Sequence, residues 1–290
     1  MMYYVYKTII FIARRLPLKG CYMIAGIAAR FFYIFASRDK IELKENLKVV
    51  LGAETDKKIL NKYVLEIFRN FAKYLVDFFR FQKITKEYID KNVHLKGQNF
   101  LDECIAGGKG AVIVALHFGN WELGGAVMGT LGYPISAIVL EHKDKRVDDF
   151  FNRQRLSNHM TPIPIGSRIR ECFGSIKNNE FVGVVGDKDY TNNGIPVTFF
   201  GKKAIIPRGP ATLSLRTGAP IVFCCLIRKK DNTYDMCLEK PIYYEPTGDD
   251  KKDEEALMGM YLRIAEKYIK ENPEQWYVFR RLWLPEQTIQ

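Results

Sequence analysis

A short apolar run that ends in polar residues constrains the fold of this chain more than any other feature. The run, 111–116, has six apolar residues in succession and predicts a fully buried strand. His117, Asn120 and Glu122 follow it, and a further apolar stretch, 123–131, predicts a helix. A strand that leads into a helix, with polar side chains at the switch, is where open α/β sheets bind their ligands.

The same alternation of strand and helix continues to residue 227. Further buried strands are predicted at 135–140, 181–185 and 221–227, and a basic, polar helix at 143–158. Such alternation is typical of an α/β domain with a mostly parallel central sheet wrapped by helices. Amphipathic helices are predicted before it and a closing helix after it, at 56–92 and 251–270.

The spacing of His117 and Glu122 suits two side chains that a turn brings together. On an ideal helix, five residues would separate them by about 140°. They meet only if His117 lies on the turn and Glu122 folds back towards it. Glu122 would then accept a proton from one imidazole nitrogen, and the other nitrogen would be free to take a proton from a hydroxyl. The alternative is that both are ordinary surface or packing residues.

The N-terminal segment is rich in apolar and aromatic residues. Residues 3–13 and 20–36 are interrupted by Lys7 and Arg30, and each is shorter than the roughly 20 apolar residues of a clean membrane span. No small-residue cleavage site follows the first, so a signal peptide is not expected. Cations interleaved with Tyr and Phe favour helices at a membrane interface, although they would also suit helices packed on the domain. We therefore divide the chain into a membrane-associating segment, 1–36, and a catalytic domain, 37–290.

The charge of the chain predicts an anionic partner. The net charge is +11 over 290 residues, so nucleic acid, anionic phospholipid and phosphorylated substrates all qualify, although no nucleic-acid-binding motif is visible. The six cysteines are scattered without a C-x-x-C pair and predict reduced thiols of a cytosolic core. There is no H-E-x-x-H motif, and no metal site is expected.

The motif His-Phe-Gly-Asn-Trp-Glu at 117–122 resembles the signature of the lysophospholipid acyltransferase superfamily. Its central residues are similar in particular to the lipid A (late lauroyl/myristoyl) acyltransferases, and mycobacterial phosphatidylinositol mannoside acyltransferases share much of the pattern. Other blocks of that family are matched in the same order, from the N-terminal part to the end of the chain: Arg38 with Glu45-Asn46-Leu47, Asp187 with Phe199-Phe200-Gly201, Gly209-Pro210-Ala211, and Pro273 with Trp276 and Arg281 to Trp283.

The resemblance implies transfer of a fatty acyl chain from acyl-ACP or acyl-CoA to a hydroxyl of an anionic (glyco)lipid, as in lipid A biosynthesis. His117 would be the general base and Glu122 would orient it. Backbone N–H groups near Gly119 and Asn120 would stabilise the oxyanion. No G-x-S-x-G elbow is present, which favours direct attack on the thioester over an acyl-enzyme. No cofactor is expected apart from the acyl donor.

Basic residues are expected to hold phosphate. The basic helix carries Arg153 and Arg155, and we expect Arg153 to make the contact, although a merely solvated helix face is the alternative. Arg208 precedes a helix, where it and backbone N–H groups could face an anion. Together with Asn120 and Asp187, which ends a strand, Arg153 and Arg208 form the predicted substrate-binding set.

Two other functions remain open. One is an acyl-CoA-dependent enzyme that acylates a phosphatidylinositol mannoside-like glycolipid or a lysophospholipid. The other is a catalytically inactive protein that binds the membrane surface. The expected location is the cytoplasmic face of the inner (plasma) membrane.

Overall fold

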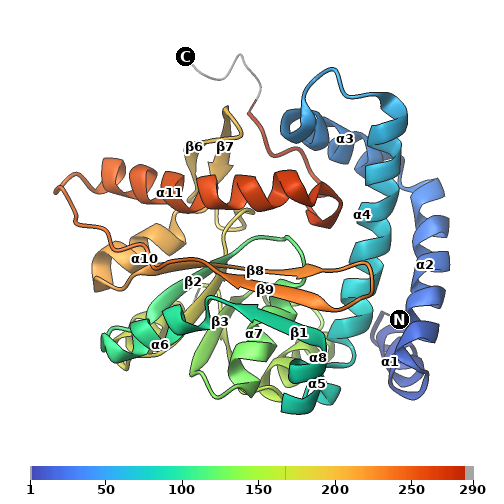
Figure 1. Ribbon diagram of the computed structural model, residues 1–290, viewed down its shortest axis with the longest axis horizontal. Helices are drawn as coiled ribbons and strands as arrows, with labels where there is room; N and C mark the ends of the chain where they lie inside the picture. Colours follow the sequence, from blue (N-terminus) through green and yellow to red (C-terminus); the bar gives the residue numbers. More distant parts are fainter. Residues whose placement is uncertain (1, 167, 285–290) are drawn as a thin grey trace.

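The computed structural model describes residues 2–166 and 168–284, in which a seven-stranded sheet forms the centre (Figure 1). Met1 of the predicted segment 1–36, and Ser167 and residues 285–290 of the predicted domain 37–290, lie outside the described residues. The strands are β1 (Val93–Lys96), β2 (Ala111–Ala115), β3 (Ile135–Val139), β4 (Met160–Pro164), β5 (Phe181–Val185), β6 (Ile195–Phe199), β7 (Lys202–Ile206), β8 (Ile221–Arg228) and β9 (Tyr234–Leu238).

The central sheet has the order β1-β9-β8-β2-β5-β3-β4. All its pairings are parallel except that of β8 with β9, so the predicted mostly parallel sheet is confirmed. A separate antiparallel hairpin joins β6 to β7. In β2, Val112 and Val114 face one core cluster and Ala111 and Ile113 face another. Because successive side chains point to opposite faces and both faces are covered, the strand is apolar throughout.

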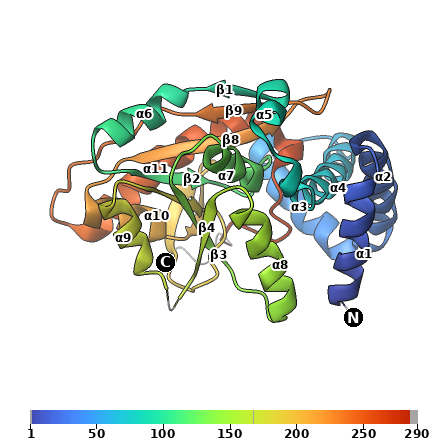
Figure 2. The same cartoon turned by 90° about the horizontal axis from the view of Figure 1, so that it is seen from below.

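Helices cover both faces of the sheet (Figures 1 and 2). One face packs against α9 (Glu171–Lys177), α10 (Gly209–Thr217) and α11 (Asp250–Glu271). The other packs against the end of α4 (Lys57–Phe78) and against α5 (Lys86–Asn92), α6 (Gln98–Ala106) and α7 (Trp121–Thr130). The remaining helical elements are α1 (Met2–Arg15), α2 (Leu18–Phe35), α3 (Ser37–Leu51), η1 (Phe81–Lys83), α8 (Lys145–Leu156) and η2 (Pro273–Gln275). A mostly parallel sheet with a helical layer on each face confirms the predicted α/β class.

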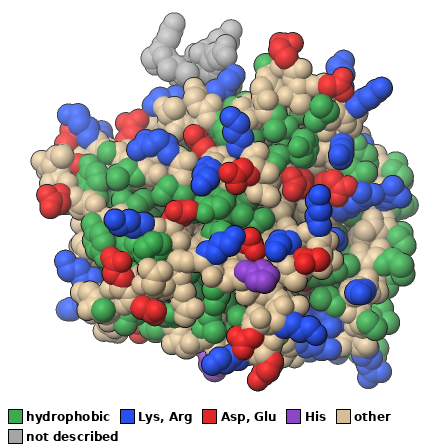
Figure 3. Space-filling view, viewed as in Figure 1, with side chains coloured by type: hydrophobic (Ala, Val, Ile, Leu, Met, Phe, Trp, Pro, Cys, Tyr) green, Lys and Arg blue, Asp and Glu red, His purple; other side chains and the backbone are tan. Residues whose placement is uncertain are grey.

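The N-terminal helices stand at one side of the molecule, where α2 lies along α4 (Figure 1). Large apolar side chains of α1 and α2 remain exposed, among them Ile12, Ile27 and Phe31. Helix α2 has 18 residues with a mean hydropathy of 1.3, and only 17% of them are buried. Its length and composition allow it to cross a bilayer, which the interruption at Arg30 had argued against. Apolar and basic side chains gather at this margin of the molecule in Figure 3.

All six cysteines are buried and unpaired. The prediction of core thiols is therefore confirmed. The boundary that we placed after residue 36 stays a prediction, because nothing in the structure separates 1–36 as a unit, and Tyr22 of α2 is itself buried against α4.

Candidate functional site

The turn between β2 and α7 is held in place by two distant parts of the chain. Gly119 has φ of 62°, and a Cβ there would lie 2.2 Å from the carbonyl oxygen of Leu226 in β8. Only glycine fits this close approach without strain. The N–H groups of Gly119 and Asn120 donate to the carbonyls of Gln275 and Leu226, both at 2.8 Å. The turn therefore depends on the sheet and on the C-terminal segment together.

His117 is paired with Asp187. Its Nδ1 lies 2.5 Å from Oδ1 of Asp187, and its backbone N–H donates to Oδ2 at 3.0 Å. The indole Nε1 of Trp276 donates to the same Oδ2 at 3.2 Å. Burial by itself raises the pKa of Asp187, but the neighbouring His117 and its hydrogen bonds outweigh that effect and hold the pKa below its usual value. An ionised Asp187 accepts from Nδ1–H, which leaves Nε2 as the unprotonated nitrogen.

The imidazole is open on its other side. The His117 side chain retains 15% of its exposure, whereas Asp187 has none. Within the described ranges, no protein group hydrogen-bonds to Nε2, and the ring edge packs on Trp121 at 5.0 Å between centroids. A group with this tautomer and this exposure can accept a proton from a substrate hydroxyl.

The predicted pairing of Glu122 with His117 is wrong. Both carboxylate oxygens of Glu122 bind Arg155 of α8, at 3.1 Å from Nε and 2.6 Å from Nη2. The reason that Asp187 takes the expected place of Glu122 is the register of the sheet. Strands β2 and β5 are neighbours in which Ala115 pairs with Val185, so the residues two positions beyond each strand end lie side by side. Whether Glu122 is needed for activity stays a prediction.

Glu122 and Arg155 form a nearly buried ion pair. Their side chains are 12% and 8% exposed. Burial would lower the pKa of Arg155, but Glu122 outweighs this effect and raises it above the ordinary value. The two-pronged contact ties the first turn of α7 to α8. Glu122 therefore contacts α8 and not the imidazole of His117.

Asn120 is not available to a substrate. It caps α7, since its Oδ1 accepts from the N–H of Leu123 at 3.1 Å, and its Nδ2 donates to Asp77 at 2.9 Å. The side chain is buried. The N–H groups of Gly119 and Asn120, near which we expected the oxyanion to bind, are also occupied, as described above. The predicted substrate-binding role of the Asn120 side chain is wrong, because the turn uses this side chain to hold itself on its neighbours. The oxyanion site near this turn stays a prediction. The next N–H groups, those of Trp121 and Glu122, have no acceptor among the residues described.

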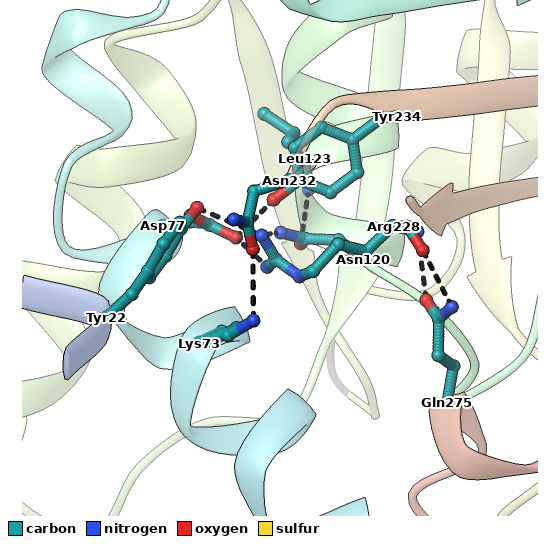
Figure 4. Close-up of polar contacts among 9 residues, drawn as sticks. All are labelled: Tyr22, Lys73, Asp77, Asn120, Leu123, Arg228, Asn232, Tyr234 and Gln275. Atoms are coloured by element: carbon teal, nitrogen blue, oxygen red, sulfur yellow. Dashed lines mark hydrogen bonds and ion pairs between the residues drawn. The ribbon is translucent and has the colours of Figure 1, made fainter. Parts of the chain in front are cut away.

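A buried polar network surrounds Asp77 and supports this turn (Figure 4). The carboxylate accepts from the hydroxyls of Tyr22 and Tyr234, each at 2.5 Å, and forms an ion pair with Arg228. With Asn120, four donors from α2, β8, β9 and the α7 cap meet on one side chain. The sequence patterns did not lead us to predict this network. An aspartate directly before Phe78-Phe79, inside an apolar helical pattern, was the available signal.

Among the described residues, neither predicted phosphate-binding arginine forms a hydrogen bond or ion pair with His117 or Asp187. Arg208 forms an ion pair with Glu254 of α11 at 3.2 Å. Arg153 is exposed on α8, and its Nε donates to the carbonyl of Asp149 at 3.1 Å. Arg153 and Arg155 do face different ways, as the helical spacing predicted. Asp187, predicted to bind substrate, instead holds His117. The substrate-binding roles of Arg153 and Arg208 stay predictions.

An apolar pocket of about 60 Å³ lies beside the turn, between α7 and the sheet. Three glycines without side chains line the pocket, namely Gly124 and Gly125 of α7 and Gly183 of β5. Met128 and Ile138 supply apolar surface. Trp121 and Glu122 also border it. Among the described residues, no three His, Cys, Asp or Glu side chains are grouped to hold a metal ion.

The chain matches the model of the family "Bacterial lipid A biosynthesis acyltransferase" over residues 1–285. It belongs to this family. The predicted resemblance is therefore confirmed, and the structure shows what some residues of the matching blocks contact. Trp276 of the C-terminal block binds Asp187, and Asn46 of the N-terminal block donates to the carbonyls of Val278 and Arg280 at 3.0 and 2.8 Å.

Individual relatives fall into two groups. The phosphatidylinositol mannoside acyltransferase of Mycobacterium tuberculosis is 27% identical over 189 residues, or 62% of this chain and 59% of that protein. The protein with the same name from Mycolicibacterium smegmatis is 23% identical over 214 residues, or 72% and 69%. The lipid A biosynthesis palmitoleoyltransferase of Escherichia coli is 27% identical over 224 residues, or 76% and 71%. The match thus spans less than two thirds of the Mycobacterium tuberculosis relative.

Proposed function

We propose that this protein transfers a fatty acyl group from a thioester carrier to a hydroxyl of a glycolipid at a membrane surface. The observation that carries the proposal is the pairing of His117 with a fully buried Asp187, which leaves Nε2 free. Membership of an acyltransferase family supports the reaction class. The exposed apolar face of α1 and α2 supports action at a membrane.

In the proposed reaction, Nε2 of His117 takes the proton of the acceptor hydroxyl as its oxygen attacks the thioester carbonyl. The tetrahedral intermediate then collapses, the C–S bond breaks, and the imidazolium returns the proton to the leaving thiolate. Asp187 stabilises the charged imidazole during this sequence. Direct transfer is favoured because, in the part of the chain that is described, no serine or cysteine hydrogen-bonds to His117. The first-turn N–H groups of Trp121 and Glu122 are the groups that we assign to the oxyanion.

The pocket between α7 and the sheet is the proposed place of a short part of the acyl chain, since its volume is below the roughly 150 Å³ of a cavity that admits benzene. It is lined by apolar side chains and glycines, and Trp121 and Glu122 border both it and the turn. An apolar chain bound there gains about 0.8 kcal/mol for each buried methylene. The proposed carrier is acyl-ACP or acyl-CoA.

The names of the relatives support a glycolipid acceptor but divide between lipid A and phosphatidylinositol mannosides. The test is to incubate the full-length protein with labelled acyl-ACP or acyl-CoA and with each acceptor class, and to identify products by mass spectrometry. If the folded protein forms no product above the enzyme-free background with either donor, the alternative of an inactive membrane-surface protein is favoured. Lysophospholipid is the third acceptor in the assay. Fractionation of intact cells tests the proposed location at the cytoplasmic face of the inner membrane.

Gly183→Val is expected to shift the preference towards shorter acyl donors. A Cβ at Gly183 meets no atom closer than the carbonyl oxygen of Ser136 at 3.7 Å, so the added Cβ is tolerated, and the methyl groups of valine are expected to take up space in the pocket. Each methylene that can no longer be buried loses about 0.8 kcal/mol of binding free energy, which corresponds to roughly a fourfold decrease in kcat/KM. Donors of increasing length should be compared with the wild type and with Gly183→Ala as the smaller step. An unchanged length profile, with normal activity on short donors, would exclude this pocket as the acyl site.

Arg155→Met is expected to lower kcat about as much as Glu122→Gln does. Each variant breaks the ion pair that ties α7 to α8 and leaves a buried partner group unpaired, which typically destabilises by about 3–5 kcal/mol. If Glu122 instead acted directly on the substrate or on His117, Arg155→Met would retain much more activity than Glu122→Gln. Steady-state kinetics on both variants, with a thermal melt as control, separates these two roles.

A further inference from the structure

A second cavity, of about 240 Å³, lies between α1 and α8. It exceeds the roughly 150 Å³ of an engineered cavity that admits benzene, so it can hold a phosphate group and part of a headgroup. Lys7 and Arg14 of α1 and Arg153 of α8 line it, together with the amides of Gln82 and Gln154. Aromatic side chains, including that of Phe150, complete the wall.

The positive charge of this cleft is not balanced by the protein. Within the described ranges, no carboxylate lies within ion-pairing distance of Lys7, Arg14 or Arg153. The Nε of Arg14 is buried without a hydrogen-bond partner. Burial also lowers the pKa of Arg14, since its charge is partly removed from water with no counter-ion. The neighbouring Arg155, by contrast, is fully paired with Glu122.

Gln154 supplies a second, independent observation at this cleft. Its side chain is 1% exposed, and its Oε1 has no donor. Buried amide oxygens are normally hydrogen-bonded, because the loss of water otherwise costs about 1–3 kcal/mol. A ligand with a hydroxyl next to an anionic group would satisfy both this acceptor and the unpaired Arg14.

The position of the cleft indicates where such a ligand comes from. Tyr6, Ile10 and Arg14 recur at helical spacing and share the face of α1 that lines the cleft. The opposite face of α1 exposes Ile9 and Ile12, which suits insertion into the apolar part of a bilayer. A helix that lies in the interface in this way puts its cationic face at the depth of lipid phosphates.

We propose that the cleft between α1 and α8 binds the phosphate of an anionic membrane lipid, held by Lys7, Arg14 and Arg153. Gln154 accepts a hydrogen bond from an adjacent headgroup hydroxyl. The site extends the proposed function by assigning a lipid phosphate contact, but it does not rest on acyl transfer. Lipid binding can be measured without acyl transfer. A failure of the phosphate site is therefore distinguishable from a failure of the proposed acyltransferase activity.

The experiment uses the full-length protein carrying His117→Ala, so that no transfer occurs during the measurement. Binding to phosphatidylcholine vesicles is compared after doping with phosphatidic acid or, at equal surface charge, with oleate, which has no phosphate. We expect tighter binding to phosphatidic acid, and Arg14→Gln should weaken that binding about tenfold, the loss of one charged hydrogen bond. Binding to oleate vesicles should change by much less. Circular dichroism checks that each variant is folded.

Arg30→Gln is the matched control, because Arg30 is an exposed cation of α2 outside the cleft. If it weakens binding as much as Arg14→Gln does, the attraction is a general surface effect and the proposal is overturned. Equal binding to phosphatidic acid and oleate overturns it as well. Inorganic phosphate is titrated separately. If it binds the cleft as tightly as the lipid does, the ligand is a free anion and the assignment to a lipid is wrong.

Discussion

His117→Ala is expected to lower the rate of acyl transfer by about 10² to 10⁴, the usual contribution of a general base, and to leave the fold intact. Asp187→Asn should have an effect of similar size for a different reason. Both oxygens of Asp187 accept hydrogen bonds, from Nδ1 and from the N–H groups of His117 and Trp276. An asparagine must turn its NH₂ group towards one of these sets of donors.

Two arrangements are then possible in the Asp187→Asn variant. If the NH₂ group faces Nδ1, the imidazole must carry its proton on Nε2 and can no longer act as a base. If it faces the other two donors, His117 and Trp276 lose their acceptor and the turn shifts. Steady-state kinetics and a thermal melt of each variant provide the measurement. A folded His117→Ala protein with near-normal transfer would contradict the assignment of the base.

Asp77→Asn is expected to destabilise the protein by about 3–5 kcal/mol, because it leaves the buried charge of Arg228 without its counter-ion. An amide also cannot accept from the four donors that meet on Asp77. Urea unfolding of the variant, compared with the wild type, measures the loss. The matched control is Glu66→Gln on the same helix, α4, since its partly exposed pair with Arg69 contributes at most about 1 kcal/mol.

Milder variants test the same network if Asp77→Asn does not fold. Tyr22→Phe removes one donor from Oδ1 and is expected to cost about 1–3 kcal/mol. The double variant Asp77→Asn/Arg228→Met should be less destabilised than the sum of its single variants, because it removes the unpaired charge. Strict additivity would show that the ion pair is not the reason for the loss. Transfer activity should fall in parallel, since Asp77 also supports the Asn120 cap.

Local patterns were sufficient to predict the elements that form the site. The apolar run of β2, the turn and α7 were all visible, because burial on both faces of a parallel strand demands a continuous apolar sequence. Strand β4 was missed, since its two prolines argue against a strand. They are tolerated because β4 lies at the edge of the sheet, where half of the backbone groups need no partner.

The sequence by itself determined the α/β class and the family, and it predicted His117 as the centre of the candidate site. Only the tertiary structure decided which groups act on that histidine. The partner of Nδ1 depends on β5 being the neighbour of β2 and on the pairing of Ala115 with Val185, which brings Asp187 to the turn. Glu122, although close in sequence, is drawn to Arg155 instead. Strand order and register are long-range properties, and short-range spacing carries no information about them.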